Sequence, residues 1–443
     1  MESFDYVLKN GDAFVGKTVE QDIDIGIKNK KISFVGKIDN NKAKKVYDMK
    51  NLTILPGCID SQVHFREPGL THKEDINSGT KGAILGGITS VFEMPNTNPS
   101  TSTVEALNEK LKIANTNSFC NYSFYIGAVR ENIESLNILE KSSGCSGIKI
   151  FMGSSTGSLL IEDDKTLEKI LTNGSRRVAV HSEDEYRLRN RKKIINGKNV
   201  SVHAHPVWRD SISALESTKR LIKIAKKVSR KIHILHISTM DEIELINKNK
   251  SFVTAEATPQ HLFFSSPDCY NKIGTLSQMN PPIRSKKHQE GIWLGVKKKI
   301  IDVIGSDHAP HTLEEKNKQY PNSPSGMTGV QTLVPIMLNF VYQQRIGIHD
   351  FVRLTSANPS KIFRMIGKGK IEVGYDADLT IVDLKKKKKI ENNWIASKSG
   401  WTPYDGEKVI GWPIHTIVNG EIVMSEDQVL GKPNGEKIKF NFE

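Results

Sequence analysis

The stretch Leu52–Phe65 reads LTILPGCIDSQVHF, an apolar and β-rich run that ends beside a histidine. It is the first of eight such runs, and the other seven are Ile88–Met94, Phe119–Ile126, Gly147–Met152, Val178–Ser182, His233–Ile237, Val253–Ala257 and Val303–Ser306. Most of them alternate with stretches such as Val104–Ala114 and Ser211–Val228, where three-to-four spacing of apolar residues predicts amphipathic helices. Eight strand–helix units over roughly 300 residues predict an α/β protein with a (β/α)8 TIM barrel. A doubly wound open sheet is the alternative, but the chain has no GxGxxG loop to hold a dinucleotide, and its one GKT sequence, Gly16-Lys17-Thr18, lies between two short predicted strands and not before a helix.

Short predicted strands flank this barrel on both sides. Three lie near the amino end and three near the carboxyl end: Tyr6–Lys9, Asp22–Ile27, Lys31–Val35, Asp378–Val382, His415–Val418 and Glu421–Met424. The last two are separated by Asn419-Gly420, a strong hairpin signal. We therefore expect a small composite β-sandwich domain made of residues 1–52 and 367–443, and a barrel domain of residues 53–366.

Composition narrows the class of protein. The 443 residues include 63 Lys and Arg against 50 Asp and Glu, which gives a net charge of +13. The excess is mostly scattered lysine, with one run at Lys385–Lys389, and no basic-aromatic interleaving accompanies it; we expect a solvated basic surface and no nucleic-acid partner. We find no secretory signal, no apolar stretch of about 18 residues, and four cysteines far apart, so we expect a cytoplasmic protein with no membrane partner.

Polar residues that interrupt or follow the apolar runs point to a site. In a barrel the carboxyl ends of the strands converge on one rim, which would bring together His64, Asn96, Lys149, His181, His236 and Asp307. Taken alone, each has an ordinary explanation: a histidine can be structural, and Asp307 can cap a helix. A lysine inside an apolar run is less ordinary, because an unpaired buried ammonium is costly. Together they favour a metal site with nitrogen and oxygen ligands.

These residues lie in motifs that resemble the dihydroorotases of the amidohydrolase superfamily. The longest is Pro56–Gly69, PGCIDSQVHFREPG, which resembles the metal-binding signature of that family. Six further motifs follow in family order: Glu93–Thr97, Gly147–Lys149, Val180–Glu183, Leu235–Thr239, Asn280–Arg284 and Asp307–His311. They extend over nearly the whole chain.

The resemblance implies a zinc-dependent enzyme that opens or closes a cyclic amide. By motif, His64 and Asp307 would bind a first metal, His181 and His236 a second, and Lys149, carboxylated on its amine, would bridge the two. Asp307 would also be the general base and acid. Arg66, Asn96 and His311 would bind the substrate carboxylate, and Asn280 the ring amide. The family further suggests a homodimer.

One position departs from the family pattern. The usual H-x-H pair is here Gln62-Val63-His64, so the first metal loses an imidazole and gains at best an amide oxygen, a weaker zinc ligand. Three outcomes stay open: two zinc ions with a looser first site, one zinc ion, or a binding protein without turnover. A second H-x-H pair, His203 and His205, is a candidate for substitute ligation, although we expect it in a loop before a helix.

The reaction that we expect is the reversible cyclisation of N-carbamoyl-L-aspartate to L-dihydroorotate, a step of de novo pyrimidine biosynthesis. Two other interpretations remain: another cyclic amidohydrolase, of the hydantoinase or allantoinase type, and a non-catalytic scaffold that assembles with aspartate transcarbamoylase. The motif Phe65–Gly69 favours dihydroorotase. The segment Thr312–Thr328, rich in polar residues, Pro and Gly, is either a lid over the rim or a surface insertion.

Overall fold

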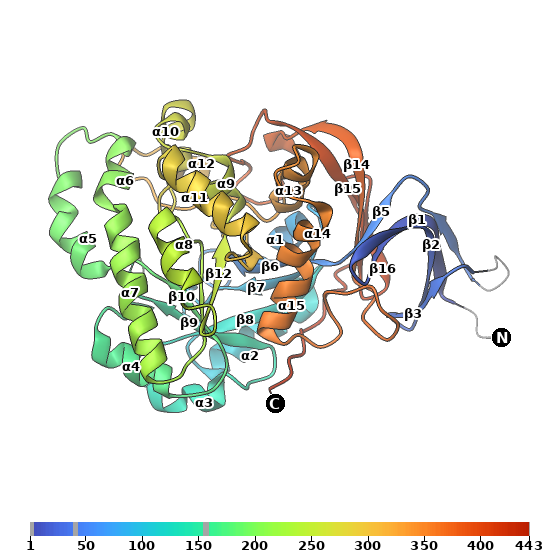
Figure 1. Cartoon of the computed structure of the whole chain (residues 1–443), viewed down its shortest axis with the longest axis horizontal. Coiled ribbons are helices and arrows are strands. Elements are labelled where there is room, and N and C mark those ends of the chain that lie inside the picture. Colours follow the sequence, from blue (N-terminus) through green and yellow to red (C-terminus); the bar gives the residue numbers. More distant parts are fainter. Residues whose placement is uncertain (1–3, 39–42, 154–158, 443) are drawn as a thin grey trace.

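The computed structural model describes residues 4–38, 43–153 and 159–442, and these residues form two sheets. Eight parallel strands follow one another in sequence order in the first sheet, which confirms the predicted barrel strands (Figure 1). They are β6 (Cys58–Val63), β7 (Ile88–Glu93), β8 (Asn121–Gly127), β9 (Cys145–Phe151), β10 (Val178–His181), β11 (Ile232–Ile234), β12 (Val253–Ala257) and β13 (Val303–Ile304).

The first and last strands of this sheet meet, so the barrel is nearly closed. Val63, at the end of β6, forms a parallel bridge with His308 beyond β13. The amide of His64 donates a hydrogen bond to the carbonyl of His308 at 2.7 Å. Because all eight strands run the same way, the residues that follow them lie on one rim of the barrel.

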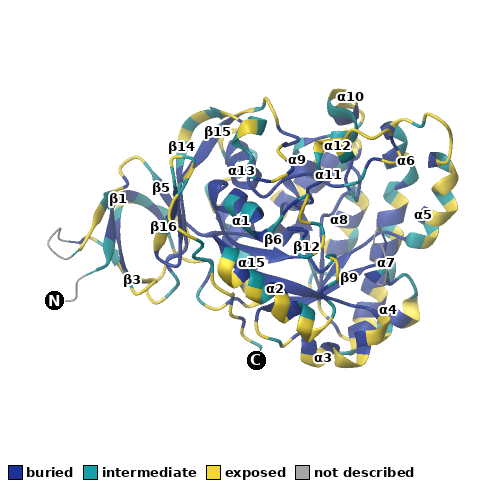
Figure 2. Cartoon of the chain, turned by 180° about the vertical axis from the view of Figure 1, so that it is seen from behind, coloured by how far each residue is buried: buried dark blue, intermediate teal, exposed yellow. Residues whose placement is uncertain are grey.

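Helices surround the strands, and Figure 2 shows that the helix faces turned toward the strands are buried while the outer faces are exposed. They are α1 (Ile76–Leu85), α2 (Val104–Asn117), α3 (Leu136–Leu139), α4 (Asp164–Thr172), α5 (Glu185–Arg191), α6 (His205–Trp208), α7 (Ser211–Lys227), α8 (Met240–Asn247), α9 (Pro259–Phe263), α10 (Asp268–Ile273), α11 (Lys286–Lys297), α12 (Leu313–Lys316), α13 (Leu333–Tyr342), α14 (Ile348–Val352) and α15 (Asn358–Phe363). The two helices predicted from apolar spacing are α2 and α7. Helix α7 begins after Asp210, whose carboxylate accepts from the amide of Ser213 at 3.0 Å and so caps the helix.

The second sheet has nine strands and joins the two ends of the chain. Its order is β17-β16-β15-β14-β5-β1-β2-β3, with β4 paired to β1. The strands are β1 (Tyr6–Val15), β2 (Thr18–Lys28), β3 (Lys31–Gly36), β4 (Val46–Asp48), β5 (Thr53–Pro56), β14 (Leu379–Lys389), β15 (Lys408–Val418), β16 (Glu421–Ser425) and β17 (Gln428–Val429). The hairpin predicted at Asn419-Gly420 joins β15 to β16, and both residues have positive φ, 49° and 78°, as a type I′ turn requires.

The structure corrects one expected strand. The run Leu52–Phe65 is not a single strand, because the chain passes from the nine-stranded sheet to the barrel at Gly57. The amide of Gly57 donates to the carbonyl of Asp378 at 2.8 Å. A Cβ at this position would lie 2.3 Å from the Thr89 hydroxyl oxygen, so the close approach of the two segments requires glycine.

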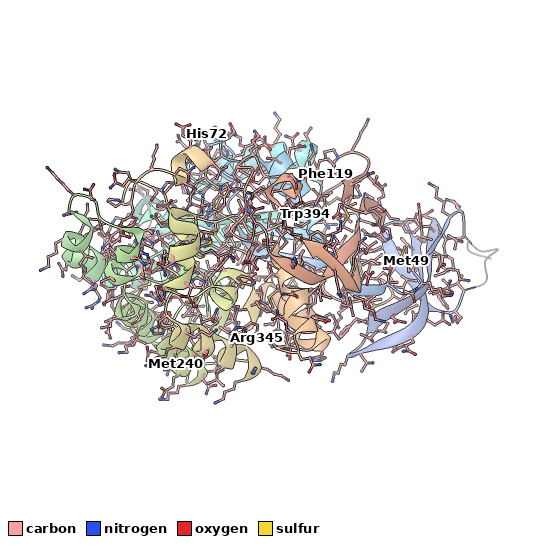
Figure 3. All side chains as sticks on the ribbon, turned by 90° about the horizontal axis from the view of Figure 1, so that it is seen from above. Met49, His72, Phe119, Met240, Arg345 and Trp394 are labelled. Carbon is pink, nitrogen blue, oxygen red and sulfur yellow. The ribbon has the colours of Figure 1, made fainter. Side chains whose placement is uncertain are left out.

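Each sheet has its own apolar core. The nine-stranded sheet encloses a small cluster that includes Leu8, Ile25, Met49 and Ile54, separate from the barrel cluster. Figure 3 labels Met49 within this sheet, at the end of the molecule opposite Met240, the first residue of α8. Among the described residues, no helix is both long and apolar enough to cross a membrane.

Candidate functional site

A pocket of about 190 Å³ opens at the carboxyl ends of the barrel strands. Nine of the ten residues predicted for the site line it, and the tenth, Lys149, does not. The lining comprises Gln62, His64, Arg66, Asn96, Phe151, His181, His236, Asn280, Asp307, Ala309, His311, Ser325 and Gly326. Of the six residues expected to converge on one rim, the structure brings five into this pocket, namely His64, Asn96, His181, His236 and Asp307.

The backbone is strained at three rim residues. Arg66, His236 and Asp307 have φ values of 65°, 37° and 47°, in the left-handed region that side chains with a Cβ seldom adopt. Such strain costs of order 1–3 kcal/mol per residue and persists where the surrounding structure imposes it, often at functional sites. These residues stand two or three positions after the ends of β6, β11 and β13, and all three line the pocket.

His181 and His236 form the first pair of candidate ligands. The Nδ1 atom of His181 lies 2.9 Å from the Nε2 atom of His236. Tetrahedral zinc with bonds of about 2.0–2.1 Å separates two nitrogen ligands by roughly 3.3 Å, so a small movement would admit the ion. Burial lowers the pKa of both imidazoles and keeps them neutral, the form that binds a metal.

His64, Asp307 and Gln62 form the second group. The Oδ1 atom of Asp307 accepts a hydrogen bond from the Gln62 amide at 2.8 Å and lies 3.2 Å from Nε2 of His64. The other ring nitrogen of His64 lies 2.8 Å from Oδ1 of Asn96. The amide oxygen of Gln62 is buried and has no hydrogen-bond partner among the described residues. An unpaired buried oxygen next to a carboxylate and an imidazole fits a cation at this position.

Lys149 lies below the rim. Its amine donates to the carbonyl of Ile150 at 2.9 Å and lies 3.7 Å from the centre of the Phe151 ring. Burial lowers the pKa of this amine well below its ordinary value, although the negative charges of Asp307 and Glu256 oppose that shift. The described residues give it no carboxylate within ion-pair distance. A neutral buried amine is the form of lysine that reacts with carbon dioxide.

The candidate metal ligands form two separate groups and not one cluster. In the parts of the chain that the structure describes, no group of three or more His, Cys, Asp and Glu side chains is gathered as a metal site. The ligand types nevertheless suit zinc, and the neutral imidazoles and the unpaired oxygen of Gln62 suit a cation.

Arg66 brings a positive charge to the opposite side of the pocket. It is 7% exposed; its Nε donates to the carbonyl of Pro310 at 3.2 Å, and its Nη2 lies 3.3 Å from Nε2 of His311. Burial lowers its pKa to about 10, so the guanidinium stays charged at neutral pH. Arg66 has two acidic neighbours in sequence motifs, Glu67 and Glu93, but among the described residues it forms an ion pair with neither. Glu93 pairs instead with Lys110, and Glu67 accepts from the amide of Ile76.

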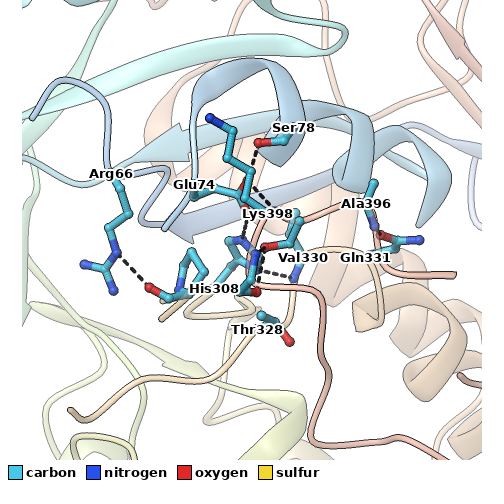
Figure 4. A network of polar contacts seen from close by, with 12 residues as sticks. Arg66, Glu74, Ser78, His308, Thr328, Val330, Gln331, Ala396 and Lys398 are labelled. Atoms are coloured by element: carbon cyan, nitrogen blue, oxygen red, sulfur yellow. Dashed lines mark hydrogen bonds and ion pairs between the residues drawn. The ribbon is translucent and has the colours of Figure 1, made fainter. Parts of the chain in front are cut away.

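A buried network fixes the loop after β13 behind the pocket (Figure 4). Nε2 of His308 lies 3.2 Å from Glu74, and Nδ1 of His308 accepts from the amide of Gly329 at 3.0 Å. Because His308 lies between two pocket residues, Asp307 and Ala309, this network holds the carboxylate of Asp307 in place. His308 belongs to the motif Asp307–His311, but nothing in that motif indicated this supporting contact.

Two other supporting contacts were not predicted. Glu183 lies 3.0 Å from Nε2 of His181 and accepts from Arg209 at 2.7 Å. Burial raises the pKa of Glu183, but the charge of Arg209, the hydrogen bond with His181 and the charge of Arg284 together outweigh burial and lower the pKa to about 2. Glu183 stands two residues after His181 in the same motif, so the sequence contained a signal that Glu183 belongs to the site. Nothing in the sequence around Arg209 indicated that it contacts Glu183.

His205 supports Asn280 and does not approach the metal donors. Its Nε2 lies 3.0 Å from the side-chain oxygen of Asn280 and from the carbonyl of Met279. His203 packs on Tyr270, with ring centres 5.8 Å apart. Neither histidine of this second H-x-H pair lines the pocket.

The segment Thr312–Thr328 is folded against the barrel. The buried amine of Lys316, in α12, donates to the carbonyls of Gln278, Pro324 and Gly326, each at 3.0 Å. Ser325 and Gly326 form part of the pocket wall. The segment is thus part of the site.

Comparisons with known proteins agree with this geometry. Residues 53–423 match the amidohydrolase family. A protein of Methanosarcina mazei named dihydroorotase is 34% identical over 432 residues, with 94% of each chain covered. A protein of Pyrococcus horikoshii with the same name is 37% identical over 417 residues, with 94% of this chain and 91% of that protein covered.

Solved structures of two related enzymes superpose on nearly the whole chain. The L-hydantoinase (dihydropyrimidinase) of Arthrobacter aurescens has a TM-score of 0.92 at 28% identity, with 98% of this chain and 99% of that chain covered. The dihydropyrimidinase of Brevibacillus agri has a TM-score of 0.90 at 25% identity, with 97% of each chain covered.

Proposed function

The chain belongs to the amidohydrolase family, and from this premise we propose that it is a dihydroorotase that interconverts L-dihydroorotate and N-carbamoyl-L-aspartate. The observation that carries the proposal is the buried guanidinium of Arg66 in the pocket, with no ion pair among the described residues. Dihydroorotate carries a carboxylate on its ring, and a buried cation is the group that binds such a carboxylate.

Ring opening requires one proton to move from water to the ring nitrogen. A bound divalent metal would lower the pKa of water and polarise the ring carbonyl. Asp307 accepts the proton as the water oxygen bonds to the carbonyl carbon. It then donates that proton to the ring nitrogen as the carbon–nitrogen bond breaks. The hydrogen bond from Gln62 and the strained backbone keep the carboxylate of Asp307 aimed into the pocket.

Substrate orientation comes from the other side of the pocket. Arg66 binds the ring carboxylate, and Asn96 and His311 complete the carboxylate pocket. Burial and the charges of Arg66, Lys73 and Lys316 lower the pKa of His311, so it offers a neutral imidazole. Asn280, supported by His205, contacts the ring amide.

The second candidate is a hydantoinase, because the two solved structures are enzymes of that type. Hydantoin lacks the ring carboxylate, so a hydantoinase has no use for a buried cation at the position of Arg66. The third interpretation, a scaffold without turnover, rests on the altered ligand Gln62.

The test is steady-state hydrolysis of L-dihydroorotate by the purified chain supplied with zinc and bicarbonate, with the zinc content measured on the same sample. We expect turnover, and slower or no turnover of hydantoin. Turnover of hydantoin alone would favour the second candidate. Bound zinc without turnover of either compound would contradict a cyclic amidohydrolase. A chain that neither binds zinc nor turns over either compound would favour the scaffold.

For the cofactor, we propose two zinc ions per chain, which the side chains of the two donor groups would hold together with a carboxylated Lys149. Support comes from the two donor groups, His181 with His236 and His64 with Asp307 and Gln62. The first group has two imidazoles, whereas the second has one imidazole and one amide oxygen, which is a poorer zinc ligand. The second group should therefore release its ion first.

Gln62→His should abolish this difference between the two sites. In the unmodified chain we expect the zinc content to fall from two to one and then to zero as free zinc is lowered by equilibrium dialysis. In Gln62→His both ions should leave together at lower free zinc, because an imidazole replaces the amide. Gln62→Leu, of similar size, should retain one ion. Equal zinc retention in all three chains would show that residue 62 is not a ligand.

The remaining properties are proposals that rest on the family resemblance. We propose that the protein is a homodimer in the cytoplasm. We also propose that each chain is divided into a composite β domain (1–52 and 367–443) and a barrel (53–366), and we add β5 to the composite β domain. Association with aspartate transcarbamoylase is a further proposal, which size-exclusion chromatography of the mixed proteins would test.

A further inference from the structure

A second and larger cavity lies at the other end of the barrel. It has a volume of about 570 Å³, within the ~300–1,000 Å³ typical of small-molecule sites. Its walls come from the amino ends of the strands: Ser146 in β9, Arg177 before β10, Lys231 before β11, Thr254 in β12 and Asp302 before β13. The site described above lies at the carboxyl ends, so this cavity is separate from it.

The cavity has a strong excess of positive charge. Five cationic side chains line it, Arg176, Arg177, Lys231, Lys361 and Arg364, against one acid, Asp302. That acid is already paired, because its carboxylate lies 2.5 Å from the amine of Lys250 and accepts from the amide of Ala255. In the described residues neither Lys231 nor Lys361 has an ion pair.

Two half-buried arginines of the cavity, Arg176 and Arg177, are held in place by backbone carbonyls. Arg176 donates to the carbonyls of Glu140, Cys145 and Ser146, and Arg177 donates to the carbonyl of Ile232 at 2.8 Å. Carbonyl groups fix a guanidinium but do not cancel its charge. Burial lowers the pKa of both arginines and the positive charge of Arg364 lowers each further, although the charges of Glu140 on Arg176 and of Asp302 on Arg177 act in the opposite direction. An anion in the cavity would relieve this repulsion.

Two further features define the ligand. The hydroxyl of Ser146 is buried and has no hydrogen-bond partner among the described residues, so a donor or acceptor is free toward the cavity. Phe363, Phe442 and Ile362 give the cavity an apolar wall. A ligand that satisfies both the charge and this wall has an anionic group and a flat apolar part.

We propose that this cavity binds a nucleoside monophosphate, with its phosphate among the basic side chains and Ser146, and its base against the partly exposed Phe442. Aromatic faces accept bases by stacking, and arginine suits phosphate because its fork of donors matches the phosphate oxygens. The proposal is independent of the reaction at the carboxyl rim.

The test uses isothermal titration calorimetry of the full chain with uridine 5′-monophosphate and with adenosine 5′-monophosphate. Uridine and inorganic phosphate, the two parts of the uridine nucleotide, are titrated separately. We expect at least one nucleotide to bind with Kd below about 1 mM, and each part alone to bind at least about tenfold more weakly. Binding of inorganic phosphate as tight as that of the nucleotides, or no nucleotide binding, would overturn the proposal.

Variants locate the binding. Lys231→Gln with Lys361→Gln removes two exposed charges and should weaken nucleotide binding by about tenfold or more. Lys231→Arg with Lys361→Arg should retain it. The matched control is Lys17→Gln with Lys50→Gln, two exposed lysines of the nine-stranded sheet, which should change nothing. If the control pair weakened nucleotide binding equally, the nucleotide would be attracted non-specifically to a basic protein.

A final variant distinguishes binding in this cavity from binding in the pocket at the other end of the barrel. Arg66→Gln alters the pocket at the carboxyl rim, and nucleotide binding should survive it unchanged. Loss of binding in this variant would mean that the nucleotide occupies the rim pocket, and would overturn the proposal.

Discussion

Asp307→Asn should reduce kcat for dihydroorotate hydrolysis by about 10³-fold, because general acid–base catalysis contributes typically 10²–10⁴-fold. Asparagine has nearly the same shape, and its side-chain oxygen can still accept from Gln62. It cannot take a proton from water or return one to the ring nitrogen. The amide nitrogen is a poor leaving group without that proton, so both halves of the reaction suffer.

The measurement is single-turnover and steady-state hydrolysis of L-dihydroorotate, with zinc content and thermal unfolding recorded on the same samples. Asp241→Asn, an exposed aspartate in the first turn of α8, is the matched control and should retain full activity. Near-normal kcat in Asp307→Asn would refute the proton-transfer role. Loss of zinc together with activity would leave ligation as its role, so the zinc content decides between the two.

Arg66→Gln should lower kcat/KM for dihydroorotate by about 10²-fold or more, since removing one member of a buried charged pair costs ~2–5 kcal/mol. The side chain is buried, and its guanidinium has no carboxylate partner among the described residues to leave unpaired. The loss should therefore fall on the ring carboxylate of the substrate.

Two comparisons make this result specific. Zinc content should stay unchanged, because Arg66 contacts Pro310 and His311 and not the proposed metal donors. Any residual hydrolysis of 5,6-dihydrouracil, which lacks the carboxylate, should change much less. Arg189→Gln, on the exposed surface of α5, is the control. Equal loss for both substrates would make Arg66 a structural residue.

The sequence predicted the barrel and most of its rim because both follow from local patterns. Each strand is an apolar run, and polar residues such as His181 and Asp307 stand at the ends of such runs. The division of Leu52–Phe65 into two strands could not be read in this way. It depends on the approach of Asp378 to Gly57, a contact between residues far apart in the chain.

Contacts that depend on several distant segments were also not predictable. Arg209, in the loop before α7, contacts Glu183, and His205, at the start of α6, contacts Asn280. Lys149 was expected at the rim, but its amine bonds to the neighbouring carbonyl of Ile150. The cavity at the amino ends of the strands collects residues from separate positions whose spacing in the sequence carries no signal.

The pairing of β5 with β14 has a consequence for synthesis of the chain. The amide of Cys58, at the start of the barrel, donates to the Thr380 hydroxyl, 322 residues away. At ~5–20 residues per second a ribosome takes roughly 15–65 s to make that stretch. Throughout this interval β5 can pair with β1 but lacks β14 on its other edge, and that exposed edge can pair with the wrong strand. Nascent chains of this protein should therefore need protection, from a chaperone or from slow release, for a time that the topology itself sets.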